Sequence, residues 1–92
     1  MTAPLNKTLT IQNKKGLHAR ASARFVQTVE EFDVKVIVSK DDTNVGGTSI
    51  MGLMMLAACQ GSQIDVSVAG PDAQAAMSAI DALLADKFGE ED

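Results

Sequence analysis

Two stretches of alternating apolar residues constrain the fold of this chain most strongly. Residues 34–39 and residues 63–69 each place valine or isoleucine at every second position, with polar residues such as Lys35 and Asp65 between them. Successive side chains of a strand point to opposite faces of a sheet, so each stretch predicts a strand with one apolar face and one solvent-exposed face. Sheets of this kind are typically antiparallel and carry their covering helices on one side.

The other periodicities complete a βαββαβα order, which predicts an α+β fold in two layers. Three helices are expected to cover one face of a four-stranded, mostly antiparallel sheet. The 92 residues contain no linker, so we expect a single domain spanning residues 1–92. The predicted strands are residues 5–12, 34–39, 43–47 and 63–69, and the predicted helices are residues 19–31, 50–58 and 73–88.

The composition argues against several classes of function. The net charge is −4 and the sequence has neither Trp nor Tyr, which argues against nucleic-acid binding. Cys59 is the only cysteine and His18 the only histidine, so neither an internal disulfide nor an ordinary zinc site is expected. No apolar run approaches membrane-spanning length, and the first residues lack a signal-peptide layout. We therefore expect a cytoplasmic monomer that needs no metal or cofactor.

The only histidine lies where a predicted strand gives way to a predicted helix. His18 directly precedes helix 19–31, and the free backbone N–H groups at a helix start favour a bound anion. Two arginines near the start of this helix and acidic residues at its end oppose the helix dipole, an arrangement that helix stability alone does not favour. We predict an anion site at His18; the alternative is an ordinary capping or surface histidine. Five basic residues and no acidic residue precede Glu30: Lys7, Lys14, Lys15, Arg20 and Arg24.

The second predicted helix carries no charge on any face. A helix that is apolar all round is normally buried all round, but one layer of helices in so small a domain cannot cover both sides of it. Leu53, Leu56 and Ala57 are expected to face the sheet. Four side chains of this helix, which we call the methionine patch, are predicted to be exposed to solvent and to bind partners. The alternative is that it packs under a loop or in a dimer. The patch consists of Ile50, Met51, Met54 and Met55.

Two motifs stand out together: Gly-Leu-His-Ala-Arg at residues 16–20 and Thr-Ser-Ile-Met-Gly-Leu-Met at residues 48–54. In sequence and separation they resemble the HPr family, the histidine-containing phosphocarriers of the bacterial phosphoenolpyruvate-dependent phosphotransferase system. The resemblance implies an open-faced β-sandwich of four antiparallel strands and three helices. It also implies that His18 accepts a phosphoryl group from enzyme I on Nδ1 and passes it to an EIIA-type protein. Ser49 matches the position that HPr kinase/phosphorylase modifies in many members.

Phosphoryl transfer at His18 would also give roles to other residues. Arg20 is expected to stabilise the phosphoryl group, with Arg24, Ile50, Met51 and Met54 contacting partners, and catalysis supplied by the partner enzymes. No carboxylate lies near His18 in sequence, and the acidic tail after Phe88 is expected to be frayed.

Two residues depart from the family pattern. Ala21 replaces the usual Pro, and this change predicts a looser helix start. Thr48 stands where Lys is common, and this change is expected to affect how the kinase recognises Ser49. The acidic ending resembles the nitrogen-regulatory branch, NPr, which acts in regulation rather than sugar transport. A non-covalent metabolite-binding regulatory domain and a purely structural interaction module remain the alternatives.

Overall fold

The structure, a computed structural model, describes residues 3–90. None of the helices within these residues is both long and apolar enough to cross a membrane. The elements, in chain order, are β1 (Leu5–Thr10), α1 (Ala19–Glu30), β2 (Lys35–Lys40), β3 (Thr43–Gly46), α2 (Ile50–Met55), β4 (Gln63–Ala69), α3 (Ala73–Ala85) and the short 3-10 helix η1 (Lys87–Gly89).

The four strands form one antiparallel sheet in the order β1-β4-β2-β3. β4 lies between β1 and β2, so its pairings fix the register of the sheet. Leu9 on β1 lies opposite Ile64, and Val38 on β2 lies opposite Val66. All four of these side chains are buried, whereas Asp65 between them is exposed. The alternation in the sequence therefore predicted the apolar face of the sheet correctly.

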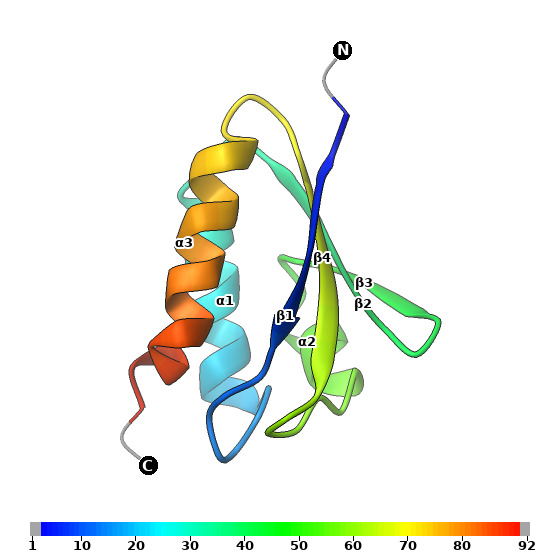
Figure 1. Ribbon diagram of the computed structural model, residues 1–92, viewed down its shortest axis with the longest axis vertical. Coiled ribbons are helices and arrows are strands. Elements are labelled where there is room, and N and C mark those ends of the chain that lie inside the picture. Colours follow the sequence, from blue (N-terminus) through cyan, green and yellow to red (C-terminus); the bar gives the residue numbers. More distant parts are fainter. Residues whose placement is uncertain (1–2, 91–92) are drawn as a thin grey trace.

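All three helices lie on one face of the sheet, as predicted (Figure 1). α1 and α3 pack side by side, and α2 packs against α1 and β3. Fully buried side chains such as Phe25 on α1 and Ile80 on α3 form the core with the apolar strand positions. Burying a side chain of this size stabilises the fold by about 1.5–3 kcal/mol. Packing against the sheet therefore holds these helices in place more than their intrinsic propensity does.

Several elements are shorter than the sequence predicted, α2 and β1 among them. α2 ends at Met55 rather than at residue 58 because Ala57 has a left-handed backbone, with a φ of 53°. The expectation that Ala57 faces the sheet is wrong, since this residue is exposed and the neighbouring Ala58 is buried instead. β1 ends at Thr10 rather than at residue 12, because Ile11 leaves the strand ladder and bonds the loop before β4.

Candidate functional site

A tight turn before α1 places the histidine. The backbone N–H of Gly16 donates to the carbonyl of Asn13 at 3.2 Å, which closes the turn. Gly16 has a φ of 65°, and a Cβ atom at this position would lie only 2.3 Å from the carbonyl oxygen of Ala58. Only glycine fits both the left-handed conformation and the close approach of the two backbones.

His18 is the N-cap of α1. Its backbone is extended, with φ −77° and ψ −178°, and its Nδ1 accepts the backbone N–H of Arg20 at 3.2 Å. The side chain thus takes the role that Ser, Thr, Asp or Asn more often fills at a helix start. The predicted position of His18 is confirmed, and its Nδ1 faces the N–H groups that carry the positive end of the helix dipole.

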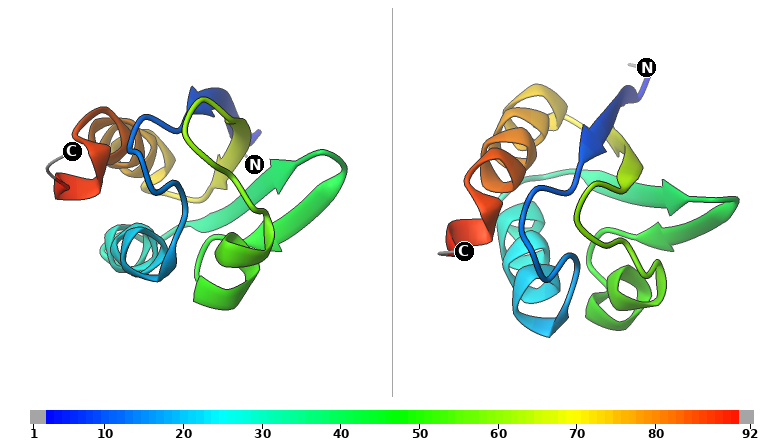
Figure 2. Two further views of the ribbon diagram at one scale, coloured as in Figure 1. Left: turned by 90° about the horizontal axis from the view of Figure 1, so that it is seen from below. Right: turned by 60° about the horizontal axis from the view of Figure 1, so that its bottom comes forward.

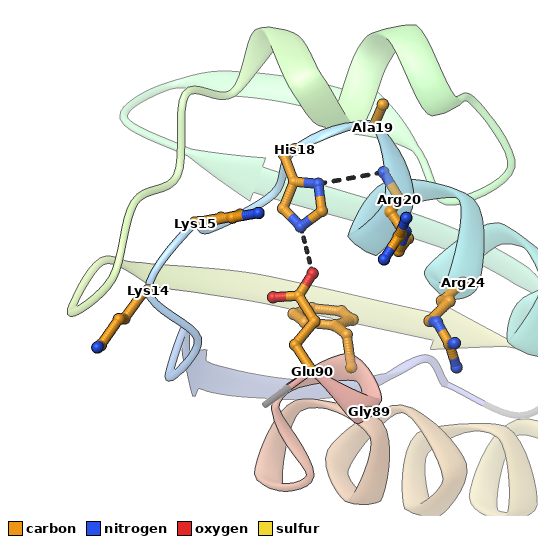
Figure 3. Close-up of a pocket in the computed structure, with 9 residues that line it drawn as sticks. Lys14, Lys15, His18, Ala19, Arg20, Arg24, Gly89 and Glu90 are labelled. Carbon is orange, nitrogen blue, oxygen red and sulfur yellow. Dashed lines mark hydrogen bonds and ion pairs between the residues drawn. The ribbon is translucent and has the colours of Figure 1, made fainter. Parts of the chain in front are cut away.

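The other ring nitrogen of His18 faces the C-terminal segment. Nε2 is in hydrogen-bond contact with Oε2 of Glu90, although 72 residues separate the two in sequence (Figure 3). A carboxylate oxygen only accepts hydrogen bonds, so Nε2 is the donor. Because Nδ1 accepts the N–H of Arg20, the two contacts together assign the neutral tautomer. The proton lies on Nε2, and the lone pair lies on Nδ1.

A buried amide holds Glu90 in place. Asn13, which is fully buried, donates through Nδ2 to Oε1 of Glu90 at 2.8 Å and to the carbonyl of Gly16 at 2.9 Å. Burial raises the pKa of Glu90, but hydrogen bonds from Asn13 and His18 and the charge of Lys15 lower it, and the net pKa lies below its ordinary value. Glu90 is therefore ionised at neutral pH and accepts hydrogen bonds through both oxygens.

The chain reaches this position through an unusual backbone path. α3 ends at Ala85 rather than at residue 88 because Lys87 and Phe88 both have left-handed conformations, with φ values of 54° and 57°. Phe88 is fully buried and fixes this turn against the core. The chain consequently turns back toward the start of α1 and delivers Glu90 to His18.

These segments enclose an open cavity of about 580 Å³ beside His18. In Figure 3 the ammonium group of Lys15 points toward His18, whereas Lys14 points away from it. Four basic side chains line this cavity, and Nδ1 faces the N-terminus of α1, so the site has a positive potential that suits an anion bound or attached there. No three His, Cys, Asp or Glu side chains within residues 3–90 are grouped so as to hold a metal ion. The cavity is lined by Lys14, Lys15, His18, Ala19, Arg20, Arg24, Phe88, Gly89 and Glu90.

The structure brings together three of the predicted site residues and places the others beside them. His18, Arg20 and Arg24 line the cavity, whereas Ser49 and the methionine patch belong to the neighbouring α2. Ser49 caps α2, because its Oγ accepts the N–H of Gly52 at 2.9 Å. Seen from below, the segment before α1 runs between the C-terminal segment and α2 (Figure 2).

The methionine patch is exposed to solvent, as the uncharged helix predicted. The exposed fractions are 40% for Ile50, 69% for Met51, 39% for Met54 and 75% for Met55.

Sequence reasoning missed Asn13 and Glu90. The acidic tail was expected to be frayed, which is wrong for Gly89 and Glu90, while residues 91–92 lie outside the described part of the chain. Asn13 lies in a polar segment that is typical of an exposed turn, although its side chain is fully buried. The only signal in the sequence was a cluster of acids at the end of a chain whose start is basic.

Known proteins match this chain over almost its whole length. A family model described as the PTS HPr component phosphorylation site matches residues 5–86. The phosphocarrier protein HPr of Neisseria meningitidis is 49% identical over 86 residues, which cover 94% of this chain and 97% of that protein. The phosphocarrier protein NPr of Shewanella violacea is 38% identical over 94% of both chains. A crystal structure of HPr from Thermoanaerobacter tengcongensis superposes with a TM-score of 0.89 at 44% identity, covering 95% of this chain and 98% of that one.

Proposed function

This chain belongs to the HPr family of phosphocarrier proteins of the phosphotransferase system, and we propose that its carrier group is Nδ1 of His18. Phosphorylated enzyme I donates the phosphoryl group, and an EIIA-type protein accepts it. The observation that carries the assignment is the position of Nδ1, whose lone pair accepts the backbone N–H of Arg20 and which faces the N-terminus of α1 in a basic cavity.

The geometry supports a transfer that needs little covalent help from the carrier. In-line phosphoryl transfer depends mainly on positioning and on positive charge around the phosphoryl oxygens. At Nδ1 the oxygens would meet the backbone N–H of Arg20 first, because this group already points at that nitrogen. The side chains of Lys15 and Arg20 add charge from the cavity wall. The catalytic machinery proper belongs to the partners.

The balance of relatives supports the sugar-transport branch. Identity is 49% to an HPr and 38% to an NPr, each over 94% of this chain. The acidic ending that suggested the nitrogen branch has a local structural role instead, because Glu90 contacts His18. A nitrogen-branch carrier would use the same His18 chemistry with a different acceptor.

Docking and regulation are assigned to α2. The methionine patch lies on the helix next to α1, so a partner that approaches His18 also meets it. Ser49 begins the same helix and is exposed. A phosphate on Ser49 would add about −1.5 to −2 charge beside the patch at pH 7. We assign Ser49 as a regulatory site for a kinase of the HPr kinase/phosphorylase type.

Intact-mass measurement after incubation with enzyme I and phosphoenolpyruvate tests the proposal. The wild-type protein should gain one phosphoryl group, which acid removes, and His18→Ala should gain none. Ser49→Ala is the matched control, since it removes the other candidate site and should still be phosphorylated. A non-covalent metabolite-binding domain would show no change in mass, and acid-labile phosphate on His18→Ala would refute the assignment of His18.

A further inference from the structure

We propose that Glu90 is a positioning residue for phosphoryl transfer. Its carboxylate keeps the ring proton of His18 on Nε2 and balances the positive charge that the ring gains when Nδ1 is phosphorylated. The inference rests on the proposed function, because it assumes that Nδ1 is the carrier atom. Glu90 lies outside residues 5–86, over which the family model matches.

The contact between Glu90 and His18 is sheltered from solvent. The Glu90 side chain is 14% exposed and that of His18 is 28% exposed, so water and salt screen their interaction less than that of a surface pair. A buried acid that accepts the N–H of an imidazole fixes its tautomer, orients the ring and stabilises the imidazolium form. The carboxylate here accepts from Nε2, so it leaves Nδ1 as the nucleophile.

Three independent features hold Glu90 at this position. Asn13 is fully buried and directs one of its two amide hydrogens to Oε1 of Glu90. Phe88 is fully buried two residues before Glu90. Lys87 and Phe88 both adopt left-handed conformations, which non-glycine residues seldom do and which often accompany function.

The carboxylate supports the nucleophile without occupying the place of the phosphoryl group. Nδ1 faces Arg20 at the start of α1, whereas Glu90 touches the opposite nitrogen of the ring. Lys15, Arg20 and Arg24 line the same cavity as Glu90, and their positive charges offset its negative charge. The arrangement therefore favours a supporting role for Glu90 over a blocking one.

The atoms and electrons of the transfer balance without any movement of the ring proton. The lone pair of Nδ1 gives up its hydrogen bond with the N–H of Arg20 and forms the bond to phosphorus. The bond from phosphorus to the leaving atom of the donor breaks, with the electron pair staying on the donor. The proton remains on Nε2, so the ring becomes a cation that is paired with the carboxylate of Glu90. When the acceptor takes the phosphoryl group, the electron pair of the N–P bond returns to Nδ1 and the ring is neutral again.

Two measurements on Glu90→Ala, Glu90→Gln and a matched control test the proposal. Glu31→Gln makes the same change of charge at the far end of α1, about 20 Å from His18 at 1.5 Å per residue. The first measurement is the single-turnover rate of transfer from phosphorylated enzyme I as a function of its concentration. The second is the ¹⁵N and ¹H NMR spectrum of the His18 ring in the unphosphorylated protein at pH 8.5. Thermal melting confirms that each variant folds.

The maximal rate should fall about tenfold in Glu90→Ala, the size of effect that a hydrogen bond to a charged group supports, with the half-saturating donor concentration unchanged. The maximal rate should fall less in Glu90→Gln, because its amide keeps an acceptor oxygen. The rate of Glu31→Gln should match that of the wild type. The downfield Nε2–H signal of the wild type should weaken or shift upfield in Glu90→Ala. A wild-type or faster rate in Glu90→Ala, or an unchanged ring spectrum, overturns the proposal.

Failure of the proposed function is separately visible. If His18 of the wild-type protein takes no phosphoryl group, the carrier assignment is wrong. The ring spectrum needs no partner and no phosphate, so it still decides whether Glu90 holds the proton on Nε2.

Discussion

The backbone N–H of Leu17 donates to the carbonyl of Ala58 at 2.9 Å. This bond ties the residue before His18 to the segment that follows α2. It thereby fixes the histidine relative to the helix that carries the methionine patch, and Gly16 allows the two backbones to meet. We expect a partner that reaches His18 to contact α2 as well, so the donor and the acceptor are expected to use overlapping surfaces.

Met51→Glu should weaken binding of both enzyme I and the EIIA-type acceptor. Met51 is 69% exposed, so the substitution should leave the fold intact, whereas an unpaired charge in an apolar contact costs about 1–3 kcal/mol, or roughly tenfold or more in affinity. Ala75→Glu adds the same charge at an exposed position of α3 and serves as the control. Titration calorimetry measures both affinities. The shared surface is disproved if one carrier molecule binds enzyme I and the acceptor at the same time.

Arg20→Ala should slow phosphoryl transfer more than Arg24→Ala does. Arg20 lies in the first turn of α1, and its own backbone N–H donates to Nδ1 of His18. Arg24 lies one turn further on, and its guanidinium lies beside Gly89. Both residues are exposed, so each variant should lose no more than about 0.5 kcal/mol of folding stability. Stopped-flow or quench-flow rates with phosphorylated enzyme I decide the order. Equal rates for Arg20→Ala and the wild type would contradict the role given to Arg20.

Ser49→Asp should melt like the wild type but accept phosphate more slowly. An Asp at the N-cap still accepts the N–H of Gly52 and suits the helix dipole, so the fold should be retained. The charge borders the methionine patch and repels an acidic partner surface that matches the basic cavity. Ser49→Ala removes the cap without adding charge and is the control, and the Ser49-phosphorylated protein should be measured as well. If all of these forms accept phosphate at the same rate, Ser49 is a cap and nothing more.

The stability contributed by Glu90 should depend on pH in a defined direction. Its pKa is lowered in the folded protein, so unfolding releases a carboxylate that binds protons more readily. The stabilisation is therefore fully present above the unfolded pKa of about 4.3 and is lost as pH falls through the lower folded pKa. The difference in Tm between the wild type and Glu90→Gln should be largest near neutral pH and vanish in acid. A difference that grows as the pH falls below 4 would show the opposite sign.

Local patterns in the sequence predicted the features that depend on neighbouring residues. The alternation in residues 34–39 and 63–69 identified the apolar face of the sheet, because side-chain direction in a strand follows position alone. The position of His18 at the start of α1 was also predictable, because the helical pattern begins directly after it.

The acid partner of His18 could not be predicted in the same way. Glu90 is 72 residues away in sequence, and its position depends on left-handed backbone at Lys87 and Phe88, which no periodicity indicates. The polar residues around Asn13 indicate a turn. Its side chain becomes buried because the C-terminal segment folds over it. Contacts between chain ends require the tertiary structure.

The most direct test of the central claim is to identify the phosphorylated nitrogen. Uniformly ¹⁵N-labelled protein is phosphorylated with enzyme I and phosphoenolpyruvate, and the one-bond coupling between ³¹P and ¹⁵N is measured on the ring of His18. Our assignment predicts coupling to Nδ1, with the proton on Nε2. Coupling to Nε2, or phosphate on any residue other than His18, would contradict it.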